Sequence, residues 1–477
     1  MWRSLRNGAW LDEQRLAVYP PMLLALSVVT IIATLSLAQG RFDANGHPLG
    51  TDFSQVWVAG LEVLRGHPEA PFDLSRHIAA QRAEFGATSD VYGWHYPPFF
   101  LAPAAALAAL PYLQALALWQ IATLLLYLAS ALAILRRMAI PPLRVALAAL
   151  AFPATLVNLG HGQNGFLTAA LLGFGFLQLR PRPLVAGVCF GLLAYKPQFA
   201  LVLPVALIAG GRWKTIAAAS ATTALMIAAS AAAFGPDTWI AFARSLADTR
   251  SIVLEDGAAG FAKIQSVFAA ARLLGGDVAA AYAAQSATTL LVVGAIAVLW
   301  RSAADERAKA AATIVATLLA TPYCLDYDMA ALAPALALLT ALGMERGFGP
   351  FVKTTLAAAF VVPLVARPLA SVAGLPLGAA TLAALFIVAL REAARTDEVA
   401  NNRSNSIFRA FGLAVFTKKS RLLRRADETF PRMSPLSSGR AIWRRIGRST
   451  CALAADGGRG DAHGVENSVP KEEASCR

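Results

Sequence analysis

The chain has 477 residues, of which 57% are hydrophobic and only 15% are charged, and its mean hydropathy is +0.54. This is more apolar surface than one soluble core can bury, so the composition excludes an ordinary soluble protein. The formal net charge is +13. Four cysteines, two in apolar sequence and two near the C-terminus, provide no disulfide framework.

Long apolar runs nearly free of charge occupy residues 20–39, 113–135, 215–234, 283–300 and 375–390. Each is close to the ~20 residues with which a helix crosses ~30 Å of hydrocarbon. Ala and Leu dominate and no alternating pattern occurs, so strands are not expected. Two further stretches, 96–135 and 184–210, are interrupted by prolines or polar residues. The sequence predicts an all-α polytopic transmembrane bundle with about 9 to 12 spans.

Charge predicts the orientation of this bundle, because Lys and Arg near span ends favour the cytoplasmic side. Basic clusters occur at 136–144, 180–182, 212–214, 301–309, 346–353 and 391–395. We therefore expect a cytoplasmic N-terminus at 1–20 and a membrane-embedded domain at 21–395. Its first outer loop, 41–96, has four Arg against seven Asp and Glu. The expected location is the inner (plasma) membrane, with the site on its periplasmic or extracellular face.

The C-terminal part, residues 396–477, differs in kind. After Glu398 it has 15 Lys and Arg against 7 Asp and Glu, and it is rich in Ser, Gly and Asn. Such a tail can bind nucleic acid, but a mostly disordered cytoplasmic extension that touches anionic lipid headgroups is the simpler interpretation. We expect no nucleic-acid partner and assign the tail no chemistry.

The first outer loop contains the most suggestive acid, Asp52, in the sequence GTDFSQVWVAG. It stands where a helix begins, so it is expected either to cap that helix with its carboxylate or to act as a general base, or both. About forty residues later, His95 and Tyr96 precede two prolines at the next apolar segment. This second motif either sets the entry angle of a helix or contributes to a site.

Other candidate site residues lie in polar breaks between apolar segments. Lys196 and Gln198 interrupt one such segment, and Lys196 is expected either to face a cavity or to extend to the membrane interface. The GHGQNG loop offers amide groups for hydroxyls or phosphate, or is an ordinary turn. The remaining candidates share an outer position: Gln163 and Asn164 in that loop, Lys263 and Ser266 on a phosphate-binding or merely solvated segment, and Tyr323, Asp326 and Asp328 at a span's outer edge.

The ordered set GTDFSQVWVAG, YGWHYPPFF, GHGQNG, AGVCFGLLAYKPQ and TPYCLDYDMAALAPA resembles glycosyltransferase family 87 over residues of about 52 to 339. The resemblance implies a C-type membrane glycosyltransferase fold and a polyprenyl-phosphate-mannose-dependent α-mannosyltransferase activity. It implies that Asp52 acts as the base of an inverting displacement, while a cation stabilises the departing phosphate. Lys196 is the first candidate for that cation, with His95 and Lys263 behind it.

The expected partners are therefore a polyprenyl-phosphate sugar, a lipid or glycan acceptor, and membrane lipids. No metal-binding spacing such as HExxH occurs and no cofactor is expected, while a metal requirement stays open. Acceptor, sugar and oligomeric state do not follow from the sequence. A transporter or lipid-sugar flippase is the alternative, since it would also use broken helices and intramembrane charges; however, no internal repeat is evident. A scaffolding membrane protein would not need these outer polar groups.

Overall fold

The computed structural model describes residues 1–87, 92–136, 138–199 and 201–400, with side chains to 397. Within these residues the regular elements are all helices. Pairing of extended segments is limited to isolated β-bridges, such as that between Ile264 and Leu325. The all-α prediction is confirmed. The tail predictions for 401–477 lie outside the described residues.

Seven described helices are long and apolar enough to cross a membrane. They are α2 (Glu13–Ser36), α6 (Tyr112–Leu135), α12 (Trp213–Phe234), α15 (Val278–Arg301), α17 (Leu332–Arg346, together with the preceding 3-10 turn from Asp326), α18 (Val352–Ala373) and α19 (Leu377–Ala400). An eighth crossing results if α7 (Pro142–Ala151) and α8 (Pro153–His161), bent by 60°, form one broken span. The expected count of 9 to 12 is reached only if shorter apolar helices are included.

Shorter helices lie between or beside these spans. They are α5 (Leu101–Ala108), α9 (Gly165–Gln178), α10 (Pro183–Leu192), α11 (Val202–Ala209) and α16 (Glu306–Leu319). The helices α9 and α16 are mostly buried, whereas α5, α10 and α11 each have an exposed side. The segment from α10 to α11 turns back within the bundle, because Arg180 before it and Arg212 after it both bind Glu306, at 2.9 and 2.7 Å. Broken apolar segments of this kind are tolerated where protein surrounds the irregular backbone.

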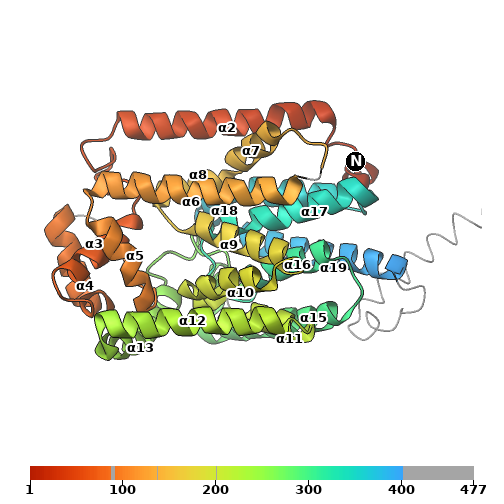
Figure 1. Ribbon diagram of the computed structural model, residues 1–477. Coiled ribbons are helices and arrows are strands. Elements are labelled where there is room, and N and C mark those ends of the chain that lie inside the picture. Colours follow the sequence, from red (N-terminus) through yellow and green to blue (C-terminus); the bar gives the residue numbers. More distant parts are fainter. Residues whose placement is uncertain (88–91, 137, 200, 401–477) are drawn as a thin grey trace, which may run out of the picture. The chain divides into compact units, whose positions relative to one another are not determined.

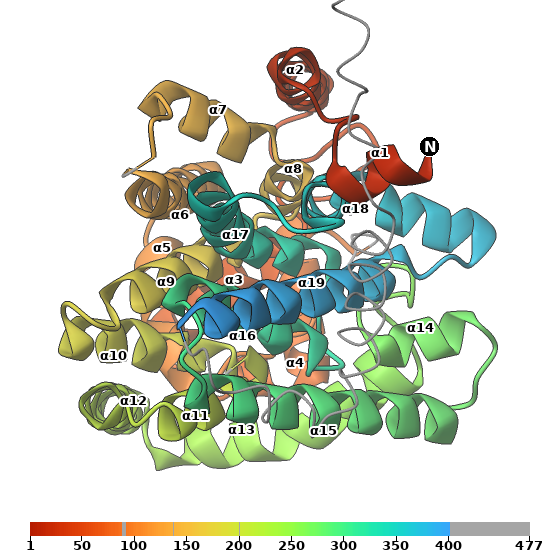
Figure 2. The same cartoon turned by 90° about the vertical axis from the view of Figure 1, so that its right-hand side faces the viewer.

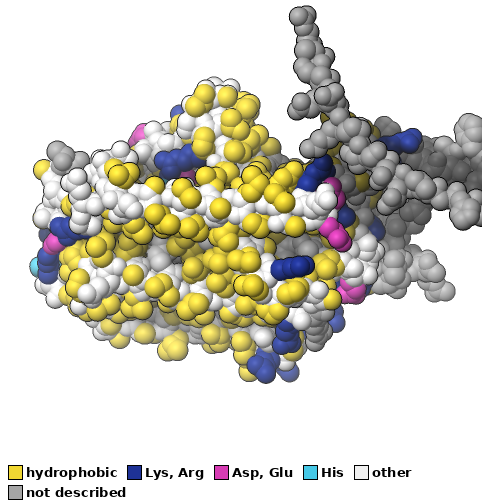
Figure 3. Space-filling model, turned by 90° about the horizontal axis from the view of Figure 1, so that it is seen from above, with side chains coloured by type: hydrophobic (Ala, Val, Ile, Leu, Met, Phe, Trp, Pro, Cys, Tyr) yellow, Lys and Arg dark blue, Asp and Glu magenta, His cyan; other side chains and the backbone are white. Residues whose placement is uncertain are grey.

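The long sides of the bundle are apolar. Figure 1 shows α2, α6 and α12 running in nearly the same direction, and Figure 2 shows the same three helices end-on. In α2 and α12 only 6% of the apolar window is buried, against 83% for the span ending in α17. On the face shown in Figure 3, hydrophobic side chains cover the middle and most charged side chains lie towards the two ends. The exposed apolar sides are suited to contact lipid, and the chain is a multi-pass membrane protein.

The basic loops that were predicted to lie on one side of the membrane meet at one end of the bundle. Besides the Arg180–Glu306–Arg212 contacts, Arg307 binds Glu345 at 2.6 Å and Arg346 binds Asp305 at 2.8 Å. The opposite end carries α3 (Phe53–Leu64), α4 (Leu74–Phe85) and α13 (Pro236–Thr249), as Figure 1 shows at the left. We call this the Asp52 end.

Candidate active site

Asp52 lies directly before α3, but its carboxylate does not cap that helix. The expected N-cap hydrogen bond is therefore absent, and the cap interpretation was wrong. Asp52 is only 4% exposed. Its carboxylate instead accepts a hydrogen bond from Gln163 Nε2 at 3.1 Å. Lys263 Nζ lies 3.3 Å from both of its oxygens. The start of α3 is held locally, because Ser54 Oγ donates to the carbonyl of Thr51.

Lys263 reaches Asp52 because two distant loops pair with each other. The amide of Asp326 donates to the carbonyl of Lys263 at 2.9 Å, and the amide of Gln265 donates to the carbonyl of Cys324 at 2.6 Å. Lys263 is 9% exposed, and its Nζ lies 5.5 Å from the centre of the Tyr327 ring. The alternative of a merely solvated Lys263 was therefore wrong.

The GHGQNG loop supplies the next side of the cluster. Gly162 has φ +62°, and a Cβ there would lie 2.6 Å from Phe53 Cβ, so the loop approaches α3 as closely as only glycine permits. Asn158 fastens the loop, donating to the carbonyl of Gln163 at 3.0 Å and accepting from the amide of Gly165 at 2.8 Å. This is more than an ordinary turn, because its side chains point into the cluster.

Tyr96 orients these side chains. Its hydroxyl donates to Gln163 Oε1 at 3.0 Å and accepts from Asn164 Nδ2 at 2.9 Å. Because Gln163 Oε1 accepts this hydrogen bond from Tyr96, the Nε2 of Gln163 points towards Asp52. Three predicted residues, Tyr96, Gln163 and Asn164, thus form one chain of hydrogen bonds that ends on the Asp52 carboxylate.

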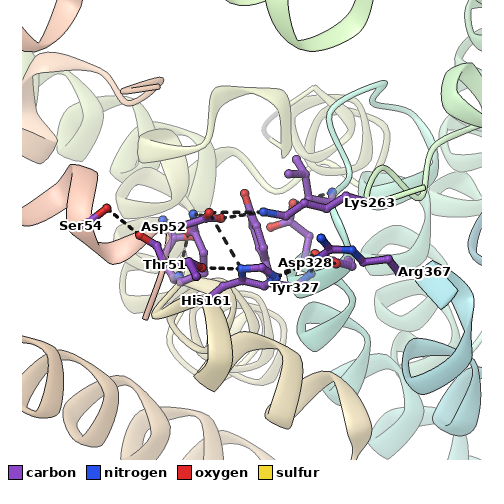
Figure 4. A network of polar contacts seen from close by, with 12 residues as sticks. Thr51, Asp52, Ser54, His161, Lys263, Tyr327, Asp328 and Arg367 are labelled. Carbon is purple, nitrogen blue, oxygen red and sulfur yellow. Dashed lines mark hydrogen bonds and ion pairs between the residues drawn. The ribbon is translucent and has the colours of Figure 1, made fainter. Parts of the chain in front are cut away.

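Two side chains that the sequence did not single out complete this cluster, as Figure 4 shows. His161 Nδ1 lies 2.8 Å from Thr51 Oγ1 and 4.0 Å from Asp52 Oδ1, and its Nε2 lies 3.9 Å from Asp326 Oδ1. Arg367 in α18 binds Asp326 Oδ2 at 3.3 Å, and 48% of its side chain is exposed. Arg367 could have been found as an arginine within an otherwise apolar run. Its partner Asp326 was a predicted site residue, but the pairing of the two could not be predicted.

Lys196 has a different partner from the one that the sequence suggested. Its Nζ lies 2.5 Å from Asp328 Oδ1, and both side chains are at most 4% exposed. The amide of Leu325 donates to the other oxygen of Asp328 at 3.0 Å. The interpretation that Lys196 extends to the interface was wrong, since the residue is buried in a pair. Its charge is balanced by Asp328, so it joins the α10–α11 turn to the segment before α17.

The remaining candidates lie around this core. His95 Nδ1 lies 2.9 Å from Thr249 Oγ1 at the end of α13, and Ser266 caps α14 (Val267–Leu273) by accepting from an amide at 3.2 Å. Gln198 is partly buried beside Lys196, and Tyr323 packs in a small apolar cluster. Among the described residues, no hydrogen bond or ion pair joins His95, Gln198, Ser266 or Tyr323 to Asp52.

Charge balance keeps Asp52 ionised. Burial by itself would raise the pKa of Asp52, but the nearby charges of Lys263 and His161 and the hydrogen bond from Gln163 outweigh burial and hold the pKa below its usual range. The pKa of His95 falls to about 4, because the surrounding protein disfavours the imidazolium. In the part of the chain that the structure describes, no group of three or more His, Cys, Asp or Glu side chains is placed to hold a metal ion.

The arrangement combines a fixed, buried carboxylate with two cations, Lys263 and Arg367, at one end of a membrane bundle. Comparison with known families decides which chemistry this suits: residues 94–322 match the model of glycosyltransferase family 87. This part of the chain belongs to glycosyltransferase family 87. No curated protein and no solved structure matches the chain significantly.

This family 87 protein is a membrane glycosyltransferase. The matched region contains the loops of Tyr96, Gln163, Lys196 and Lys263. Asp52, Asp328 and Arg367 lie outside that region, and it is the tertiary structure that brings them to the matched loops. The family match therefore covers only some of the residues in the cluster, and the others are identified by their contacts in the structure.

Proposed function

We propose that this glycosyltransferase moves a hexose, mannose according to the family resemblance, from a polyprenyl-phosphate donor to a lipid-linked or glycan acceptor. The reaction takes place on the outer face of the plasma membrane. It is an inverting displacement: Asp52 takes the proton of an acceptor hydroxyl while that oxygen attacks the anomeric carbon and polyprenyl phosphate leaves.

The observation that carries this proposal is the contact of Asp52 with Lys263 at the end of an apolar bundle. In an inverting displacement the base stands on the acceptor side of the anomeric carbon and the phosphate leaves from the opposite side, so the site needs a cation within side-chain reach of both. Lys263 meets this requirement. Arg367, half exposed near the end of α18, does not contact Asp52 itself but binds the neighbouring acid Asp326. Lys196 is less suited than the sequence suggested, because Asp328 occupies its ammonium group.

A lipid donor explains why such a site lies within a membrane protein. The donor's isoprenoid chain stays in the hydrocarbon, so its phosphate lies near the membrane surface and has to be met there. The exposed apolar sides of the bundle and the exposed guanidinium of Arg367 support this mode of approach. A soluble nucleotide-sugar donor would make no use of the apolar sides.

The test is incubation of the purified protein with a radiolabelled polyprenyl-phosphate mannose and a lipid extract from a cell envelope. Transfer of label to a new lipid or glycan is expected, and Asp52→Asn should abolish it while the variant inserts normally. Gln163 Nε2 can still donate to that asparagine, and the folded yield of the variant in detergent is measured beside transfer, so that lost activity is distinguished from lost folding. Label that moves only from a nucleotide sugar, or that crosses a vesicle membrane unreacted, would contradict the proposal and favour a transporter or flippase.

A further inference from the structure

The cations of the cluster are paired with acids in this structure. Lys263 binds Asp52 at 3.3 Å, and Arg367 binds Asp326 at the same distance. The proposed base is therefore occupied by a cation before any substrate is present. This pairing creates a difficulty for catalysis, because a carboxylate that is stabilised by a lysine accepts a proton poorly.

The contacts of Asp52 show which group makes its carboxylate a poor base. Lys263 is the lysine in direct contact with the carboxylate, whereas His161 Nδ1 lies 4.0 Å away and is charged only when protonated. Gln163 donates a neutral hydrogen bond. His95, Tyr96 and Tyr327 also face Asp52 from farther away, and the charge of Asp52 acts on each of them. Removal of Lys263 is thus the change that would most increase the basicity of Asp52.

A donor phosphate offers Lys263 a competing partner. A phosphate monoester or diester carries its negative charge on several oxygens that accept strong, charge-assisted hydrogen bonds from an ammonium group. Lys263 sits in an irregular segment just after Gly260, which has φ +78° and open space around it. The contact with Asp52 is long for an ion pair with direct hydrogen bonds, at 3.3 Å to each oxygen.

We infer that the phosphate of the polyprenyl-phosphate sugar draws Lys263 away from Asp52, so that donor binding itself turns Asp52 into a base. The inference rests on the proposed function. The bond between the acceptor oxygen and the anomeric carbon then forms as the bond from that carbon to the phosphate oxygen breaks. The acceptor proton passes to Asp52, and the electron pair leaves with the phosphate, whose charge Lys263 now balances.

This exchange gives the enzyme an order of events. Without donor, Asp52 stays paired and cannot activate water or an acceptor. With donor bound, the base and the stabilised leaving group appear together. Arg367 is free to make the same exchange from Asp326, but Asp326 lies beyond His161 and does not contact Asp52 in the described structure.

The test compares pH profiles of sugar transfer. The acid limb of kcat/KM for the donor reports the free enzyme, and the acid limb of kcat reports the complex with both substrates. In the wild type the apparent pKa should be higher in kcat than in kcat/KM by at least about one unit, a tenfold change in proton affinity. In Lys263→Met the two limbs should coincide, whatever rate remains.

Equal limbs in the wild type would overturn the inference while leaving the proposed function intact. Absence of transfer at every pH would instead contradict the proposed function. A second measurement needs no Lys263 variant: infrared difference spectra, wild type minus Asp52→Asn, with and without polyprenyl phosphate lacking a sugar. The Asp52 carboxylate band should titrate at higher pH when polyprenyl phosphate is bound, and an unchanged titration would also overturn the inference.

Discussion

The ammonium nitrogen of Lys263 lies 3.3 Å from both carboxylate oxygens of Asp52, although 211 residues separate the two in the chain. The contact depends on the pairing of the Lys263 loop with the segment 324–326 and on the close approach of the GHGQNG loop to α3. The site is thus assembled from loops at one end of the bundle. Each loop should be separately testable.

Gly162→Ala should destabilise the protein and impair transfer. An alanine would keep a positive φ and place its Cβ 2.6 Å from Phe53 Cβ and 2.9 Å from the carbonyl of Gly50. Strain and crowding together should cost about 2 to 4 kcal/mol. Gly211→Ala is the control, since Gly211 has φ +64° but open space around it, and should cost only about 1 to 2 kcal/mol. Thermal unfolding in detergent measures both, and equal losses would show that Gly162 is not tightly packed.

Breaking the buried pair of Lys196 and Asp328 should be more harmful than removing it. Lys196→Met or Asp328→Asn alone alters one partner of a pair that is at most 4% exposed, and should cost about 3 to 5 kcal/mol. The double variant Lys196→Met with Asp328→Leu should recover a large part of the folded yield. The measurement is the monodisperse fraction after extraction. A double variant worse than both single ones would mean that Lys196 has a role beyond this pair.

Tyr96→Phe should reduce transfer more than it reduces stability. The hydroxyl orients Gln163 and Asn164 towards the proposed base, and its loss should cost about 1 kcal/mol of stability and about tenfold in kcat. Tyr127→Phe is a matched control, because its buried hydroxyl donates to the carbonyl of Ala149, away from the cluster. Unfolding and kinetics are measured for both variants. Similar kcat values for the two would remove Tyr96 from the site.

The segment that contains α4 should lose stability in acid because of His77. This residue of α4 is fully buried, and within the described residues neither ring nitrogen has a hydrogen-bond partner. Burial, with a smaller contribution from nearby His95, lowers its pKa to about 3, against about 6.5 in an unfolded chain. The unfolded state therefore binds the extra proton between these values, so stability falls as pH drops, by at most about 1.4 kcal/mol per unit.

The measurement is the Tm of wild type and His77→Leu between pH 7 and 4.5. The wild type should show the steeper decline on acidification, and the same substitution at His67, whose side chain is exposed, serves as the control. Parallel curves for wild type and His77→Leu would show that His77 does not titrate with unfolding.

The membrane helices could be predicted closely because apolar length is a local property. The runs at 113–135 and 215–234 differ from α6 and α12 by at most two residues at either end. The last helix was predicted too short, at 375–390, since charged residues follow. α19 continues to Ala400 because Asp397 and Thr396 bind the amides of Ala303 and Asp305, a contact that no local pattern reveals.

The sequence by itself determined the class of protein and the residue types of the site. Uninterrupted apolar runs require a bilayer, and a fixed acid among aromatic and amide side chains already marked Asp52 as a candidate. Only the tertiary structure decided how charges pair: Lys263 with Asp52, Lys196 with Asp328, and Arg367 with Asp326. The reason is physical, since burying a charge requires a partner, and the partner is chosen by how helices and loops pack rather than by distance along the chain.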